Sequence, residues 1–236
     1  MEVISRTSPS RAARSSFIYG RWTVWKLGPF PAQKEPLRPF FSPDGQWLGF
    51  FAGGKMKKVS VSGGAALTLG DAAQPRGASW GSQGIIAFVP GTASVLQRVS
   101  DSGGTPQPLT RFEKGDTGHL RPDFLPGGNA VLFAGGAAGD PRMAVYSIGT
   151  GERRNLIQQQ GVTQPRYAAS GHLVYAQGGS LMAVPFDPRR LAVTGAAVLV
   201  VEGVLQSQSN RTAQYSLSAT GSLVYVPGAL RRPNAG

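Results

Sequence analysis

The sequence contains no cysteine and only two histidines, His119 and His172. The lack of cysteine excludes disulfide bonds and zinc sites that are built from thiolates. Two histidines leave few candidates for a metal centre or for general acid–base chemistry. We therefore expect neither a bound metal nor a cofactor.

Long apolar runs are also missing. No stretch approaches the roughly 18 apolar residues of a membrane-spanning helix. Residues 1–16 lack the apolar run of about 7–15 residues that a secretory signal needs, and we expect them to form a disordered basic tail. Acidic residues are scarce, with 12 Asp and Glu against 24 Lys and Arg, for a formal net charge of +12. The basic residues are dispersed in short groups, which favours solvated strand edges over a nucleic-acid interface.

Glycine and proline are abundant instead, at 33 and 18 of 236 residues, and they gather at turn positions. The stretch at 38–51, RPFFSPDGQWLGFF, predicts a strand, a tight turn and a second strand. In the turn Ser42-Pro43-Asp44-Gly45, the proline ring presets φ, the Asp44 carboxylate can cap the backbone, and Gly45 accepts a positive φ.

The same pattern returns along the chain. The glycines that close the successive turns are separated by 39, 44, 43 and 50 residues, at Gly45, Gly84, Gly128, Gly171 and Gly221. Strand-and-turn repeats of about 40–45 residues are typical of β-propeller blades. We predict an all-β propeller of four-stranded blades over residues 17–228, followed by a C-terminal tail at 229–236. The count is about five blades, four complete and one composite from the two termini, or the chain is an open arc of a larger propeller.

Aromatic residues recur at one position of the repeats, and we assign them to packing between blades. They are Phe41, Trp80, Phe124, Tyr167 and Tyr215.

Two groups of residues suggest chemistry. Ser79 lies in Gly77-Ala78-Ser79-Trp80-Gly81, which matches the G-x-S-x-G pattern of hydrolase nucleophile elbows, but the required strand–turn–helix context is not expected here. His119 stands near Asp116 and Asp123, where an acid–base or metal role is conceivable.

Several phrases carry a resemblance to a known family. Among them are FFSPDGQWLGFFAGGKMKKVSVSGG (41–64), RPDFLPGGNAVLF (121–133) and GHLVYAQGGSLMAVPFDPRRLAVTG (171–195). The chain resembles WD-repeat-like propellers of the TolB type, and more specifically the propeller region of bacterial receptor-type serine/threonine protein kinases. That resemblance implies an extracytoplasmic, periplasmic sensor whose full-length relatives are membrane-anchored. The kinase motifs themselves are absent.

We therefore expect a non-catalytic propeller that binds a protein or small-molecule ligand at the mouth of its channel. Repeat phase places the binding loops at Arg76, His119, Arg121, Gln164 and Arg166, with a further loop at 208–214. Two alternatives stay open. One is a propeller hydrolase or hydrolase accessory domain, and the other is a truncated fragment with no independent function.

Overall fold

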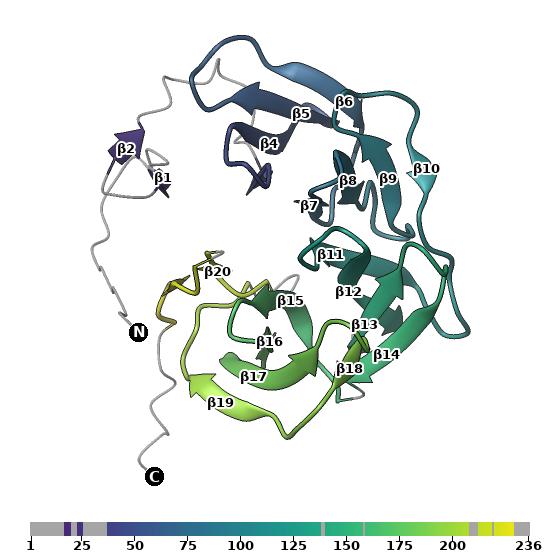
Figure 1. Cartoon of the computed structure of the whole chain (residues 1–236), viewed down its shortest axis with the longest axis vertical. Helices are drawn as coiled ribbons and strands as arrows, with labels where there is room; N and C mark the ends of the chain where they lie inside the picture. Colours follow the sequence, from purple (N-terminus) through teal and green to yellow (C-terminus); the bar gives the residue numbers. More distant parts are fainter. Residues whose placement is uncertain are drawn as a thin grey trace.

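The computed structural model describes residues 17–19, 23–25, 37–137, 140–157, 159–207, 212–218 and 220–228. These residues form strands and turns, with no helix among them, and so none that could span a membrane. Four antiparallel sheets follow one another around an arc, each built from strands consecutive in the sequence (Figure 1). Strands β7, β11 and β15 face the middle of the arc, and the last strand of each sheet lies at its rim. The chain is thus an all-β propeller, as the repeats predicted.

The sheets keep the order of the sequence. The first contains β3 (Leu37–Phe41), β4 (Trp47–Ala52), β5 (Lys55–Ser60) and β6 (Leu67–Asp71). The second contains β7 (Ala78–Trp80), β8 (Ile85–Phe88), β9 (Gln97–Ser100) and β10 (Gln107–Pro108). The third contains β11 (Gly118–Phe124), β12 (Ala130–Ala137), β13 (Asp140–Ser147) and β14 (Arg153–Ile157). The fourth contains β15 (Thr163–Ala168), β16 (His172–Gln177), β17 (Ser180–Asp187), β18 (Ala192–Val193) and β19 (Val198–Val201).

The first turn shows why these sequences form hairpins. The Gly45 N–H donates to the Ser42 carbonyl oxygen at 2.9 Å, and Gly45 has φ of 69°. The Asp44 carboxylate accepts hydrogen bonds from the Gln46 N–H at 3.0 Å and from the Ser42 hydroxyl. The glycines at the matching turns, Gly84, Gly128, Gly171 and Gly221, also have positive φ, a conformation that costs glycine little.

The cores lie between neighbouring sheets. Phe51 and Met56 of the first sheet pack with Ile86 and Phe88 of the second. Ala87 and Val89 pack in turn with Val131 and Phe133 of the third sheet, and the third and fourth sheets share a further cluster. The second and third sheets therefore bury both faces. Packing between sheets holds the first strands beside one another: β3 contacts β7, β7 contacts β11, and β11 contacts β15.

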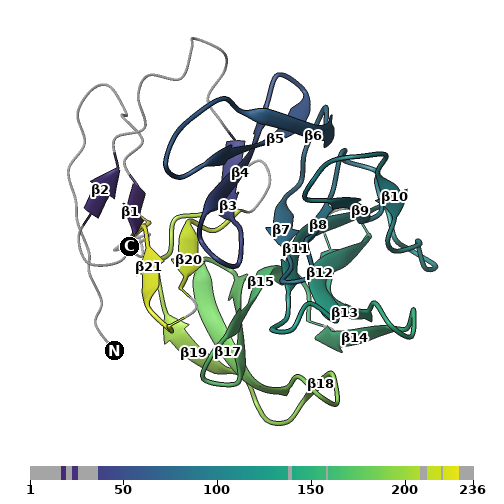
Figure 2. The same cartoon turned by 45° about the horizontal axis from the view of Figure 1, so that its top comes forward.

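The two ends of the described chain form separate two-stranded hairpins. One pairs β1 (Phe17–Tyr19) with β2 (Thr23–Trp25), and the other pairs β20 (Tyr215–Leu217) with β21 (Leu223–Tyr225). The β20–β21 hairpin lies beside the fourth sheet and shares an apolar cluster with it (Figure 2). No pairing among the described strands joins the two hairpins, so the composite blade, the count of five and ring closure stay predictions. The expected tails at 1–16 and 229–236 lie outside the described residues.

Candidate functional site at the inner strands

The first strands of the third and fourth sheets carry the same irregularity. The register of β11 shifts between Leu120 and Asp123, and that of β15 shifts between Thr163 and Arg166. Inside these bulges, Arg121 has φ of 53° and Gln164 has φ of 55°. This left-handed conformation is costly for residues that carry a side chain, at about 1–3 kcal/mol. At the matching place before β7 the chain has Gly77, with φ of 121°. The bulge geometry thus favours glycine, yet two sheets place a long polar residue there.

The two strained residues bring their side chains together. The Arg121 guanidinium lies 3.5 Å from the Gln164 amide oxygen and also donates to the Thr212 hydroxyl. The Gln164 amide nitrogen donates to the Tyr215 carbonyl oxygen at 3.3 Å, while the Tyr215 hydroxyl donates to the Gln164 carbonyl oxygen. Arg121 and Gln164 are both buried. The network therefore connects the third sheet, the fourth sheet and the β20–β21 hairpin.

An ion pair continues this network. Arg166 donates to the Asp123 carboxylate at 2.5 Å, and the same carboxylate accepts the Tyr167 N–H at 3.1 Å. Burial lowers the pKa of Arg166, but the neighbouring Asp123 carboxylate outweighs it and holds that pKa above its usual value. Burial raises the pKa of Tyr215, so its hydroxyl stays protonated and remains a donor. We call Arg121, Asp123, Gln164, Arg166, Thr212 and Tyr215 the inner polar cluster.

Arg76 joins the cluster through its backbone. Its carbonyl oxygen accepts the Arg121 N–H at 2.9 Å. The next residue, Gly77, has no room for a side chain, because a Cβ there would lie 3.0 Å from the Arg121 Cα. The close approach of β11 to the segment before β7 therefore helps to fix the backbone position of Arg121.

His119 belongs to a separate buried group between the second and third sheets. The Leu96 N–H donates to the Thr110 hydroxyl at 3.0 Å, and that hydroxyl lies 2.8 Å from His119 Nδ1. His119 Nε2 lies 3.1 Å from the Asp116 carboxylate, which Arg153 holds from the other side through both of its terminal nitrogens. This order of donors fits a neutral imidazole with its proton on Nε2.

The His119 group lies in the packed interior between the second and third sheets. His119 is fully buried, and the Phe112 and Phe133 rings lie 5.3 and 4.6 Å from its own. Burial lowers the pKa of His119, although hydrogen bonding to Asp116 opposes the shift. The order of hydroxyl, imidazole and carboxylate resembles that of a catalytic triad. However, the Thr110 hydroxyl already accepts the Leu96 N–H, and the imidazole has no exposed surface. The His119 group therefore has a structural role, because it connects the second and third sheets.

Ser79 also has a structural partner. Its hydroxyl accepts the Phe124 N–H of the next sheet at 3.0 Å, and its residue lies on strand β7 with β8 after it. No described histidine hydrogen-bonds to Ser79, and no helix follows it. The nucleophile-elbow pattern is therefore a first-strand sequence. Likewise, no three His, Asp or Glu side chains of the described chain converge as a metal site.

The structure brings together some of the residues expected to bind, and separates others. Arg121 and Gln164 meet directly, and Arg166 of β15 forms an ion pair with Asp123 of β11. His119 lies in its own group. Thr212 was expected only as part of a loop, of which 208–211 lie outside the described residues. The polar role of Tyr215 was missed, because its repeat position indicated packing alone. A signal was present: Arg121 and Gln164 both precede a proline, at the same phase of the repeat.

No protein-family description and no curated protein matches the sequence. Solved structures do match the fold. TolB from Acinetobacter baumannii has a TM-score of 0.56 at 20% identity, over 72% of this chain and 45% of its own. The chain thus spans less than half the length of that protein. XC5397 from Xanthomonas campestris, described as a gluconolactonase, has a TM-score of 0.63 at 12% identity, over 80% of this chain and 68% of its own. An oligogalacturonate lyase in complex with manganese has a TM-score of 0.57 at 11% identity, over 74% of this chain and 55% of its own.

These findings correct one expectation. We predicted a non-catalytic sensor or binding platform and no enzyme, because kinase motifs are absent. That prediction is wrong, since solved structures with this fold include enzymes, namely proteins described as gluconolactonases and an oligogalacturonate lyase. The identities are too low to transfer an activity, but they suffice for the architecture. The chain has the fold of a TolB-type β-propeller.

Proposed function

We propose that this chain is a propeller hydrolase, or the substrate-binding propeller of a hydrolase, and that the inner polar cluster holds the substrate. One observation carries the proposal: Arg121 and Gln164 keep left-handed backbones at matching bulges and direct their side chains to each other. Strained residues of this kind persist where the surrounding structure enforces them, and they concentrate at functional sites. β-Bulges beside active sites likewise serve to redirect side chains.

The chemistry of the cluster suits an ester or lactone. Hydrolysis places negative charge on the carbonyl oxygen in the transition state, and prepositioned N–H donors stabilise it. Arg121 supplies a cationic donor and Gln164 an amide donor. Asp123 supplies the carboxylate that serves as general base toward the attacking water molecule.

The charge of the cluster favours an acidic substrate. The inner polar cluster contains two arginines, Arg121 and Arg166, and one carboxylate, Asp123. Arg76, whose carbonyl oxygen accepts the Arg121 N–H, lies two residues before β7. A group of charges with one prevailing sign attracts ligands of the opposite sign. We therefore propose a small sugar acid ester or lactone as the substrate class. The gluconolactonases among the structural neighbours support this choice at the level of the fold.

The test is turnover and binding by the purified chain. Glucono-δ-lactone and p-nitrophenyl acetate serve as substrates, and gluconate serves as a ligand that cannot be hydrolysed. We expect Arg121→Gln to lower turnover about 100-fold, the typical cost of one oxyanion donor. The matched control, Arg98→Gln, removes an equal charge from an exposed position on β9 and should leave turnover unchanged.

Each outcome decides something. Turnover that depends on Arg121 supports the hydrolase. Gluconate binding that depends on Arg121, without turnover, supports the substrate-binding propeller of a hydrolase. Absence of both in a chain that unfolds cooperatively would refute the proposal.

The more specific resemblance, to the propeller of receptor-type serine/threonine kinases, is retained as a proposal about ancestry. The phrases at 41–64, 121–133 and 171–195 support it. The hydrolase proposal does not depend on it.

A further inference from the structure

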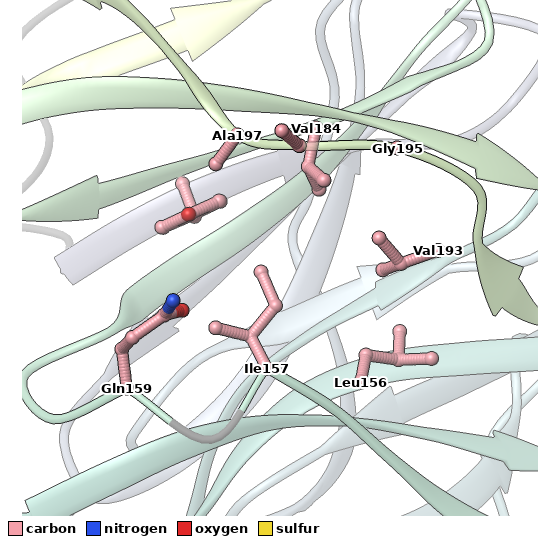
Figure 3. Close-up of a pocket in the computed structure, with 9 residues that line it drawn as sticks. Leu156, Ile157, Gln159, Val184, Val193, Gly195 and Ala197 are labelled. Atoms are coloured by element: carbon pink, nitrogen blue, oxygen red, sulfur yellow. The ribbon is translucent and has the colours of Figure 1, made fainter.

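A cavity of about 540 Å³ lies between the third and fourth sheets, away from the inner polar cluster. Figure 3 shows Leu156 and Ile157 on one side, with Val184, Gly195 and Ala197 across from them. The volume falls within the roughly 300–1,000 Å³ range of small-molecule sites. Ile157 and Val184 are buried members of the core between the two sheets, so the inner walls are fixed by packing.

The cavity depends on a feature found in the fourth sheet. In the first two sheets, short turns containing Gly63-Gly64 and Gly103-Gly104 connect the third and fourth strands. In the fourth sheet the connection spans 188–197 and includes β18, which pairs with the end of β17. Val193 of β18 and residues 195–197 form one wall of the cavity. An insertion in the repeat thus forms one side of this space.

The polar groups of the lining are few. Tyr175 lines the cavity and is 1% exposed, and no described residue hydrogen-bonds to its hydroxyl. A tyrosine combines an apolar ring with a hydroxyl that can donate or accept a hydrogen bond. Gln159 contributes the other polar side chain, and the lining contains no charged residue.

We propose that this cavity is a binding site for a neutral, mostly apolar small molecule that carries one hydroxyl or carbonyl oxygen. The apolar walls remove the body of the molecule from water, which is favourable in proportion to the apolar area buried. The oxygen of the ligand hydrogen-bonds to the Tyr175 hydroxyl. A charged ligand is disfavoured, because no lining residue compensates for its lost hydration. This site is independent of the proposed hydrolase function.

The probe is 1-naphthol, with 1-naphthalenesulfonate as its charged counterpart, and binding is measured by calorimetry on the purified chain. We expect 1-naphthol to bind at least tenfold more tightly than the sulfonate. Tyr175→Phe keeps the ring and removes the hydroxyl, so it should weaken binding about 2- to 10-fold, the value of one hydrogen bond.

A second variant fills the cavity. Ala197 is exposed and directly precedes β19, so Ala197→Phe adds volume there without replacing a core residue. We expect it to abolish binding of 1-naphthol. Ala66 holds the same place before β6 and is also exposed, and Ala66→Phe should bind as the wild-type chain does. The proposal is overturned if the wild-type chain does not bind 1-naphthol, if Ala197→Phe binds it equally well, or if the sulfonate binds as tightly.

Discussion

Replacing Asp116 by alanine should destabilise the propeller strongly, although Asp116 lies in a connection between sheets. Its side chain is 4% exposed, and those of its partners His119 and Arg153 are 0% and 9% exposed. The carboxylate accepts hydrogen bonds from the Glu113 N–H, from His119 and from both terminal nitrogens of Arg153. The substitution would leave a buried guanidinium and a buried imidazole N–H without this acceptor.

Removing one partner of a buried ion pair costs about 3–5 kcal/mol. For a chain of this size, each kcal/mol lowers the unfolding midpoint by about 2–4 °C, so we expect a drop of roughly 6–20 °C. Urea denaturation measures the loss of unfolding free energy, and thermal denaturation measures the drop in the unfolding midpoint. The matched control is Asp71→Ala, because Asp71 pairs with Lys55 at 2.5 Å but the two side chains are 85% and 49% exposed. Exposed pairs contribute about 0–1 kcal/mol. A loss below about 1 kcal/mol for Asp116→Ala, equal to that of the control, would refute the reasoning.

Two further predictions concern neighbouring groups. Burial holds the pKa of His119 below its usual value near 6.5, so the unfolded chain takes up a proton before the folded chain does, and stability should fall as the pH drops below about 6.5. Denaturation at pH 7.5 and 5.5 should show this loss in the wild-type chain and not in His119→Gln, and an equal loss in both would contradict it. Ser79→Ala leaves the Phe124 N–H without its acceptor and should cost about 1–3 kcal/mol. Turnover should be unchanged when measured on the folded variant, whereas lost turnover would restore Ser79 as a nucleophile.

Much of the fold follows from local chemistry. Turns such as Ser42 to Gly45 prescribe their own backbone geometry, and the short continuous apolar runs beside them fit strands that are buried on both faces. Repetition of this unit is enough to predict a propeller. The ends are harder to predict, because no other described strand pairs with β1–β2 or with β20–β21 and fixes their place in a sheet. The insertion that forms β18 departs from the repeat, and so the cavity beside it had no precedent in the other copies.

The candidate site was predictable only in part. Repeat phase placed Arg121 and Gln164 at matching positions, and the structure brings them into contact. Their left-handed backbones were not predicted, because both residue types prefer other conformations and the bulge is imposed by the sheet. His119 was expected beside Arg121, since a single residue, Leu120, separates them in the sequence. Its side chain instead lies between sheets, where Arg153, distant in sequence, completes the group.

The substitution Arg121→Lys tests whether Arg121 acts on the substrate, as the proposed function requires. Lysine keeps the positive charge but lacks the planar fork that donates to two acceptors at once. We predict that kcat/KM for glucono-δ-lactone falls at least about tenfold, while the thermal unfolding midpoint stays within about 3 °C of the wild-type value. An unchanged kcat/KM in this variant would contradict the claim that the inner polar cluster is the site of hydrolysis.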